Sequence, residues 1–307
     1  MTASLPLPGS LGAWVLAARP KTLTAAVAPV LVGAAVGSLS STMQTAPAAR
    51  VLWGLSLCVL GALCLQIGTN FVNDAADHAR GADDSERLGP PRAVALGLLT
   101  ARQAWRGALI AFSAAVCCGI GLTALAGSAI VIIGLASIAA GWAYTAGPFP
   151  LAYNALGELF VVIFFGFVAV CGTSLVISGQ VPLEAWRASL VPGAMAAAIL
   201  VVNNVRDEPN DRRVGKRTLP VIFGRGFGVA EFIVLLAIGY GVPVYLWQQS
   251  HRRELLLPLL SAPWGAWLIS GLIRQRGAAL NRILAGTAQL MIVHCALFAL
   301  AIWLCRR

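Results

Sequence analysis

Charged residues are scarce in this chain of 307 residues, because only 11% are Asp, Glu, Lys or Arg, whereas a soluble domain carries about 25%. With 58% hydrophobic residues, this scarcity excludes an ordinary soluble protein and predicts one helical membrane domain over residues 1–307. No basic patch or tail gathers the net charge of +10, so the sequence does not indicate a nucleic-acid-binding protein. The seven cysteines form no CxxC pair, and no basic segment precedes the first apolar run, so neither a zinc site nor a cleaved signal peptide is expected.

Long apolar runs fill most of the sequence. A helix needs about 20 mostly apolar residues to cross the hydrocarbon core of a bilayer. The runs of this length predict an all-α polytopic membrane protein with about nine transmembrane helices. The predicted spans are approximately residues 14–38, 50–73, 104–124, 127–146, 156–177, 188–205, 227–247, 255–273 and 283–304.

Lysine and arginine are distributed unequally between the two sides of the predicted membrane. The N-terminal segment and the loops after the second, sixth and eighth spans carry 16 of the 22 basic residues, and the opposite side carries 6. Because basic residues favour the cytoplasmic side, this side and the N-terminus are expected to be cytoplasmic, as in a bacterial inner-membrane protein.

Eight of the 12 acidic residues lie in two short windows on this side, at residues 74–86 and 207–211, and basic residues follow each window. Carboxylates that gather at the edge of a bilayer repel one another, and a bound divalent cation offsets that cost. Mg²⁺ is usually bound by one or two carboxylates together with substrate phosphates. The windows therefore predict a membrane site for a metal–diphosphate substrate, and the alternative is that they are solvated loops with helix-ending charges.

The spacing of the acidic residues suggests which of them bind metal. If the second and sixth spans continue as helices, each window presents two carboxylates on one helix face. Two facing pairs could hold two Mg²⁺ ions around one diphosphate. The four candidate ligands, which are also the candidate catalytic residues, are Asp74, Asp77, Asp207 and Asp211. Asn70 and Asn203 each precede an aspartate by four residues and could add an amide oxygen or bind the substrate.

Residues 144–158 form a turn rich in Pro and Gly between two predicted spans. Tyr144 and Tyr153 could line a cavity, where an aromatic face would stabilise an allylic carbocation. The alternative is that both tyrosines belong to the interfacial belt of aromatic residues. Glu158 begins a predicted helix, so it is either a helix-end carboxylate or part of the site.

Seven short motifs follow one another along the chain. The acidic motifs are Asn73-Asp74-Ala-Ala-Asp77 and Asn203-Asn-x-Arg-Asp207-x-x-x-Asp211. The other motifs are Arg19-Pro-Lys-Thr-Leu23, Arg87-Leu-Gly-Pro-Pro-Arg-Ala-Val94, Tyr144-Thr-x-Gly147-Pro148, Leu156-Gly-Glu158 and Gly215-Lys-Arg-Thr-Leu219. In their order, these motifs resemble the UbiA superfamily of membrane prenyltransferases, and within it the branch that acts on 1,4-dihydroxy-2-naphthoate.

This resemblance implies nine helices around a central cavity, capped by cytoplasmic loops at about residues 74–103, 147–155 and 206–226. It implies Mg²⁺-dependent transfer of a polyprenyl chain from its diphosphate to the naphthoate ring, with loss of the ring carboxylate, giving demethylmenaquinone. The four aspartates would bind Mg²⁺–diphosphate. The residues expected to contact substrate are Asn70, Asn73, Asn203, Arg87, Arg92, Lys216, Arg217, Lys21, Tyr144 and Tyr153. The expected partners are the two substrates and membrane lipid, with no nucleic acid and no obligate protein partner.

Two departures from the superfamily bear on the acceptor. Gly81 stands where many members have a further acidic residue, and residues 144–158 contain no Lys or Arg. Both departures argue against a 4-hydroxybenzoate enzyme. They do not exclude it, so an aromatic acceptor of the 4-hydroxybenzoate or homogentisate type stays an alternative. A cation-coupled transporter is disfavoured, because transporters place ionisable residues near the bilayer midplane. The group that takes the ring proton is open among a loop aspartate, a tyrosine and the substrate itself.

Overall fold

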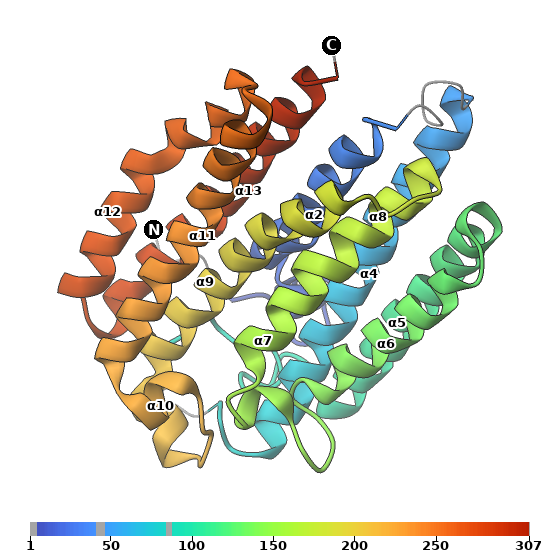
Figure 1. Cartoon of the computed structure of the whole chain (residues 1–307). Helices are drawn as coiled ribbons and strands as arrows, with labels where there is room; N and C mark the ends of the chain where they lie inside the picture. Colours follow the sequence, from blue (N-terminus) through green and yellow to red (C-terminus); the bar gives the residue numbers. More distant parts are fainter. Residues whose placement is uncertain (1–4, 41–46, 84–87, 307) are drawn as a thin grey trace.

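The computed structural model describes residues 5–40, 47–83 and 88–306, and the regular structure in these ranges is helical (Figure 1). Within them, eight helical segments are long and apolar enough to cross a membrane. The predicted span 127–146 forms a helix of 15 residues, Ala129–Ala143, which is shorter than the others. The predicted all-α membrane fold is confirmed, with eight long segments and one shorter apolar helix among the described residues.

The helical segments follow one another along the chain with short connections. The eight long segments are Leu11–Gly37, Ala48–Ala79, Ala101–Ala126, Gly157–Ser178, Leu183–Arg213, Arg225–Ser250, Arg253–Arg274 and Gly277–Leu304. The α-helices are α1 Leu11–Ala18, α2 Leu23–Gly37, α4 Ala48–Ala79, α5 Ala101–Ala126, α6 Ala129–Ala143, α7 Gly157–Val161, α8 Ala169–Ser178, α9 Leu183–Arg213, α10 Leu219–Phe223, α11 Arg225–Ser250, α12 Ala262–Arg274 and α13 Leu280–Leu304. The 3-10 helices are η1 Pro20–Thr22, η2 Leu151–Tyr153, η4 Arg253–Ser261 and η5 Gly277–Ala279, and η3, Val162–Val168, is a π-helix.

Helix α9 is the central helix of the structure (Figure 1). Its most apolar stretch is 78% buried, whereas the other candidate spans are 22–44% buried. Small residues permit this central position, because membrane helices approach most closely where side chains are small. A Cβ atom on Gly166 of η3 would lie 2.7 Å from the Ser189 carbonyl oxygen, and one on Gly193 would lie 3.1 Å from the Val162 carbonyl oxygen. Glycine at both positions therefore lets η3 pack directly on the α9 backbone.

The first membrane segment is broken between α1 and α2. Arg19 has φ 53°, in the left-handed region, and the following residue, Pro20, disfavours a helical conformation at Arg19. The Ala18 carbonyl oxygen accepts a hydrogen bond from Asn70 Nδ2 of α4, at 2.9 Å, and Thr22 Oγ1 lies 3.0 Å from the same nitrogen. Asn70, which is 2% exposed, thus holds the break against α4.

Helices α4 and α9 continue beyond the predicted spans 50–73 and 188–205. Helix α4 ends at Ala79 and α9 ends at Arg213, so the starts of the expected cap loops 74–103 and 206–226 are helical. The acidic pairs therefore lie on the last turns of two helices, and each pair shares one helix face.

A buried histidine supports a proline kink in the C-terminal half. Pro243 lies inside α11 and cannot donate a backbone hydrogen bond to the Gly239 carbonyl. His294 Nε2 of α13 lies 3.1 Å from that carbonyl oxygen, and Ser261 Oγ lies 3.0 Å from His294 Nδ1. Because a carbonyl oxygen only accepts, Nε2 carries a proton and donates it to Gly239. His294 therefore joins α11 and α13.

We expect His294→Leu to lower the free energy of unfolding by about 2 kcal/mol, because the buried Gly239 carbonyl loses its donor. The loss is measured as a lower Tm in detergent. His294→Gln keeps an N–H donor and is expected to lose less than half as much. Equal losses for the two variants would show that packing, and not the hydrogen bond, is what His294 provides.

Candidate active site

Three segments that are distant in sequence meet at one end of the structure, where α4 and α9 end (Figure 1). Asn210 Nδ2 of α9 donates a hydrogen bond to the Ala82 carbonyl oxygen, just after α4, at 3.1 Å. The Arg217 backbone N–H donates to the Tyr153 carbonyl oxygen, at 3.0 Å. The segments expected to cap a cavity are thus in contact, and they bring both acidic motifs to one place.

Asp77 of the first motif is held by two partners. Arg92 lies 2.8 Å from Asp77 Oδ2, and the Tyr153 hydroxyl donates to Asp77 Oδ1 at 2.9 Å. Arg92 also lies 3.3 Å from Asp83 Oδ1. Asp77 is 7% exposed, so its charge is balanced by the guanidinium group and not by water.

Asp207 of the second motif is held by the preceding residue. Arg206 is 1% exposed, and its Nε and Nη2 atoms donate to the two oxygens of Asp207 at 2.7 and 2.6 Å. The same guanidinium donates to Asn203 Oδ1 at 2.7 Å and to Asn281 Oδ1 of α13 at 2.9 Å. This two-point contact fixes Asp207 more firmly than a single hydrogen bond would.

The other aspartate of each motif keeps an open oxygen. Asp74 Oδ2 accepts a long hydrogen bond from the Val94 N–H at 3.4 Å, and Asp211 Oδ1 lies 3.5 Å from Lys216 Nζ. Asp74 Oδ1 and Asp211 Oδ2 are buried and accept no hydrogen bond from any residue that the structure describes. A buried carboxylate oxygen without a partner is costly, so these two oxygens favour a bound cation.

Lys216 and Tyr153 lie between the two motifs. Lys216 Nζ is 5.7 Å from the centre of the Tyr153 ring, and Arg80 lies 5.2 Å from the same ring. Burial acts to lower the pKa of the Lys216 ammonium, but Asp211 and the other nearby aspartates raise it above its usual value. Burial, and then the charge of Asp77, raises the pKa of the Tyr153 hydroxyl. Lys216 thus stays a cation and Tyr153 stays a neutral hydrogen-bond donor.

The donor set fits magnesium, although it does not form a complete metal cage. In the described part of the chain, no three His, Cys, Asp or Glu side chains are grouped so that they could hold an ion. Mg²⁺ needs only one or two carboxylates when substrate phosphates and water complete its shell. The open oxygens of Asp74 and Asp211 are ligands of the required type.

The remaining predicted site residues lie at different distances from these aspartates. Asn73 accepts a hydrogen bond from the Thr145 hydroxyl at 2.7 Å. The Arg217 and Lys21 side chains are exposed, and Arg217 contributes its backbone N–H. Arg87 lies outside the described residues.

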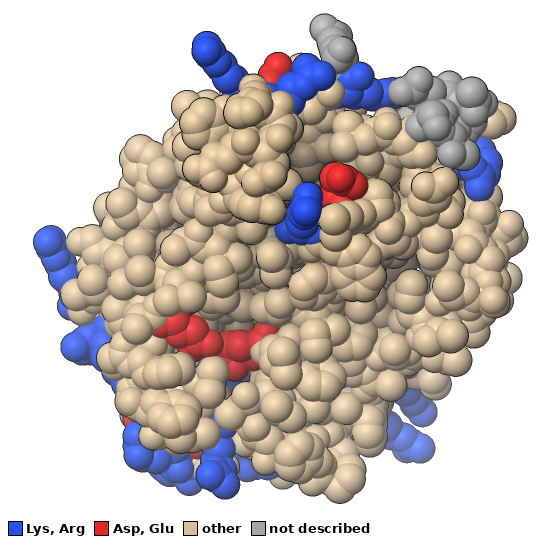
Figure 2. Space-filling model, viewed as in Figure 1, with Lys and Arg blue, Asp and Glu red and all other residues tan. Residues whose placement is uncertain are grey.

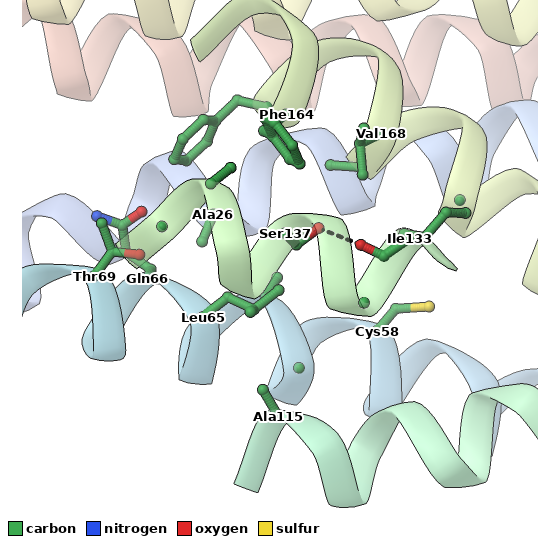
Figure 3. Close-up of a pocket in the computed structure, with 18 of the residues that line it drawn as sticks. Ala26, Cys58, Leu65, Gln66, Thr69, Ala115, Ile133, Ser137, Phe164 and Val168 are labelled. Atoms are coloured by element: carbon green, nitrogen blue, oxygen red, sulfur yellow. Dashed lines mark hydrogen bonds between the residues drawn. The ribbon is translucent and has the colours of Figure 1, made fainter. Parts of the chain in front are cut away.

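An apolar cavity of about 320 Å³ lies along α4 and includes Asn73, the residue before Asp74, in its lining (Figure 3). Asn73 and Tyr144 line its polar end, and Gln66, Thr69 and Cys58 follow along α4. The 15 residues from Asn73 to Cys58 give this wall a length of about 22 Å, at 1.5 Å per residue. Figure 3 also shows Phe164 of η3 facing the cavity. The cavity therefore offers a long apolar space that leads away from a charged site.

The sequence matches the UbiA prenyltransferase family over residues 26–293. The chain belongs to this family. The predicted resemblance is thus confirmed, and the protein is an integral membrane prenyltransferase. It is 35% identical over 240 residues to the 1,4-dihydroxy-2-naphthoate octaprenyltransferase of Mycobacterium tuberculosis, covering 74% of this chain and 80% of the relative. The Haemophilus influenzae enzyme of the same name is 29% identical, covering 94% and 95%.

A solved structure has the same UbiA fold. It is that of a UbiA homologue from Archaeoglobus fulgidus bound to DMAPP and Mg²⁺, with a TM-score of 0.67 and 17% identity. The match covers 94% of this chain and 98% of that chain. At this identity the likeness concerns the fold, and it supports the arrangement of helices described above.

Two residues of this UbiA site were missed from the sequence as site residues. Arg206 stands in the second acidic motif, directly before Asp207, but it is not among the predicted substrate or metal ligands. Arg80 donates hydrogen bonds to the Thr145 and Gly147 carbonyl oxygens and lies over the Tyr153 ring. The Asn-Asn-x-Arg-Asp motif signalled Arg206, whereas no local pattern marked Arg80.

Two arginine–carboxylate pairs on α9, one buried and one exposed, allow the effect of burial on the stability contribution of an ion pair to be tested. Arg206→Ala is expected to cost about 3 kcal/mol or more of stability, because it leaves Asp207 buried without its partner. Arg212→Ala removes the exposed pair with Glu208 and is expected to cost less than about 1 kcal/mol. Thermal unfolding in detergent measures both values. A tolerated Arg206→Ala would mean that water or a cation replaces the guanidinium.

Proposed function

We propose that this UbiA-family protein transfers a polyprenyl chain from its diphosphate to 1,4-dihydroxy-2-naphthoate. The reaction depends on Mg²⁺, releases the ring carboxylate as CO₂ and gives demethylmenaquinone in its reduced, quinol form. The observation that carries the proposal is the pair of open, buried oxygens of Asp74 and Asp211 beside an apolar cavity. The names of the bacterial relatives and the motifs of the naphthoate branch support the acceptor.

The acidic and the basic residues would bind different parts of the metal–diphosphate substrate. Asp74 and Asp211 would hold Mg²⁺, which, when bound, neutralises the charge that develops on the leaving diphosphate. Lys216 and Arg92 would bind phosphate oxygens, because both lie beside the aspartates and carry positive charge. Asp77 would orient Arg92 through their ion pair, and Asp207, which is paired with Arg206, would fix the end of α9. A UbiA homologue of the same fold is bound to DMAPP and Mg²⁺, which supports a prenyl diphosphate and a metal ion as the ligands of this end of the fold.

The apolar cavity would hold the polyprenyl chain of the donor. Its lining along α4, α6 and η3 is almost entirely hydrocarbon, and it excludes water from the reacting carbon. Tyr144 and Tyr153 lie at the charged end, where their rings would stabilise the allylic cation as the C–O bond to the diphosphate breaks. This arrangement keeps the cation close to the acceptor and away from water.

We further propose that the whole chain, residues 1–307, is one transmembrane domain in a bacterial inner membrane. The excess of basic residues on the active-site side supports a cytoplasmic orientation of the site and of the N-terminus. Two water-soluble groups, the diphosphate and the naphthoate carboxyl, would then enter from the cytoplasm.

Substitution of the open aspartates tests the metal site. Asp74→Asn and Asp211→Asn are each expected to lower turnover about a thousandfold, because the amide loses the charge that binds Mg²⁺. Glu208→Gln changes a half-buried acid between Asp207 and Asp211 that is paired with the exposed Arg212, and it is expected to keep near-normal turnover.

The assay uses reconstituted protein, Mg²⁺ and a polyprenyl diphosphate, with 1,4-dihydroxy-2-naphthoate, 4-hydroxybenzoate or homogentisate as acceptor. A decarboxylated, prenylated product that disappears with EDTA supports both metal and acceptor. A product formed only from another acceptor would overturn the naphthoate assignment.

Filling the cavity tests the path of the prenyl chain. Gly134 lines the cavity about 15 Å along α6 from Tyr144, and a Cβ there would have no neighbour within 4 Å. Gly134→Phe is expected to raise KM for long-chain donors at least tenfold and to leave DMAPP unaffected. Ala136→Phe, on an exposed position of the same helix, is the control. An unchanged long-chain KM for Gly134→Phe would place the chain elsewhere.

A further inference from the structure

Glu158 is a buried acid outside the two aspartate motifs. It lies at the start of α7, and it is 7% exposed. Asn204 Nδ2 of α9 donates a hydrogen bond to Glu158 Oε1 at 2.6 Å. Asn204 is 3% exposed, and its Oδ1 atom has no hydrogen-bond partner in the described part of the chain. A buried, unpartnered amide oxygen next to a carboxylate favours a ligand that donates hydrogen bonds.

A second glutamate reaches the same place from α11. A Cβ on Gly228 would lie 2.5 Å from Val205 Cγ2, so this glycine lets α11 approach α9 closely. Glu231 follows Gly228 by three residues and therefore lies on the same helix face, towards α9. Glu231 Oε2 is buried and accepts no hydrogen bond from the described residues, and Glu231 interacts electrostatically with Glu158.

This cluster of Glu158, Asn204 and Glu231 adjoins the proposed diphosphate site. The Tyr144 hydroxyl lies 3.3 Å from where a Cβ of Gly157 would be, and Tyr144 interacts electrostatically with Glu158. Lys216 also interacts with Glu158. In Figure 2, acidic side chains lie in a hollow at the place where α7 and α11 stand in Figure 1. The contacts of Tyr144 and Lys216 with Glu158 place the cluster next to the proposed diphosphate site.

The open atoms of the cluster define the chemistry of its ligand. Glu231 Oε2 and Asn204 Oδ1 are both acceptors, and both lack a donor among the described side chains. An aromatic ring with hydroxyl groups supplies an apolar body and two O–H donors. A diphosphate or a carboxylate would be repelled by the two glutamates, so these anionic groups belong on the side of Lys216.

We infer that this cluster binds the hydroxyl groups of the aromatic acceptor and that Glu231 takes a hydroxyl proton during prenyl transfer. The inference rests on the proposed function for the reaction step. The acceptor O–H bond breaks, its proton moves to Glu231 Oε2, and the oxygen becomes a carbonyl. The ring π pair then forms the new C–C bond to the prenyl carbon, and the C–O bond of the donor breaks, its electron pair leaving on the diphosphate. Loss of the ring carboxyl group as CO₂ returns its bonding electron pair to the ring, and the carbonyl oxygen regains the proton from Glu231 to give the quinol. Glu158, held by Asn204, positions the ring.

Glutamine substitutions separate proton transfer from binding. Glu231→Gln keeps the shape of the side chain but cannot take the proton, so kcat is expected to fall by about 10²- to 10⁴-fold. KM for the prenyl diphosphate should change less than threefold. Glu231→Asp keeps the carboxylate and is expected to recover at least a tenth of the wild-type kcat. Glu184→Gln, an exposed acid elsewhere in the chain, is the matched control and should match wild type.

Two further readouts identify the role of Glu231. Ring-halogenated acceptors have more acidic hydroxyl groups, so they are expected to restore part of the turnover of Glu231→Gln, which a merely structural defect would not allow. Calorimetric binding of 1,4-dihydroxy-2-naphthoate should weaken at least tenfold in Glu158→Gln. Binding of its dimethyl ether, which has no O–H donor, should be equally weak in that variant and in wild type.

The outcomes distinguish this inference from the proposed function. If wild type turns over but the glutamine variants keep normal kcat and acceptor binding, the inference is overturned and the proposed function stands. If wild type binds the hydroxylated ring through the glutamates but forms no product from any acceptor, the proposed function is overturned and the binding site stands. A Glu231→Gln defect that acidic acceptors leave unchanged would overturn the proton-transfer role.

Discussion

The active-site end of the structure depends on the neutralisation of aspartates at the ends of α4 and α9. Arg92 balances Asp77, and Arg206 balances Asp207, within an environment that contains little water. Both motifs follow the same plan, because one aspartate is paired with an arginine and the other keeps a buried open oxygen. The paired residues fix the positions of the helix ends, and the open oxygens are left available for a cation. In the proposed site, one aspartate of each pair would thus fix the helix end and the other would bind the ion.

The central helix connects this charged end to the rest of the membrane domain. Helix α9 is packed on η3 through facing glycines, and it carries Asn204, Arg206 and the second aspartate motif on its last turns. A shift of α9 along its axis would therefore move the metal ligands relative to the cavity and to Glu158. Tight packing of small residues on this helix explains how a chain with few polar contacts in the bilayer keeps a defined site.

The membrane spans, the two acidic motifs and their common side follow from the sequence, because apolar run length and charge clusters are local patterns. Contacts between residues that are distant in sequence leave no local pattern, so the sequence does not predict them. The spacing of Asn70 suggests a role in substrate binding, and the structure adds that Asn70 binds the Ala18 carbonyl oxygen at the break before Pro20. The motif marks Arg206, but only the structure shows that the helix continues past it and that its side chain points inward to Asp207. The acidic partner of Glu158 lies on α11, 73 residues further along the chain.

The small number of acidic ligands in the proposed site also links the binding of Mg²⁺ to the binding of the diphosphate donor. Without three grouped acidic side chains in the described residues, the proposed site would complete a magnesium shell with water and with phosphate oxygens from the donor. Linkage then requires that metal and diphosphate raise each other's affinity by the same factor. In the proposed reaction, an enzyme without donor would hold the ion weakly, and cleavage of the donor would leave a metal–diphosphate pair held by few protein ligands. Product departure and loss of the ion would then be one event, which would return the enzyme to its arginine-paired resting state.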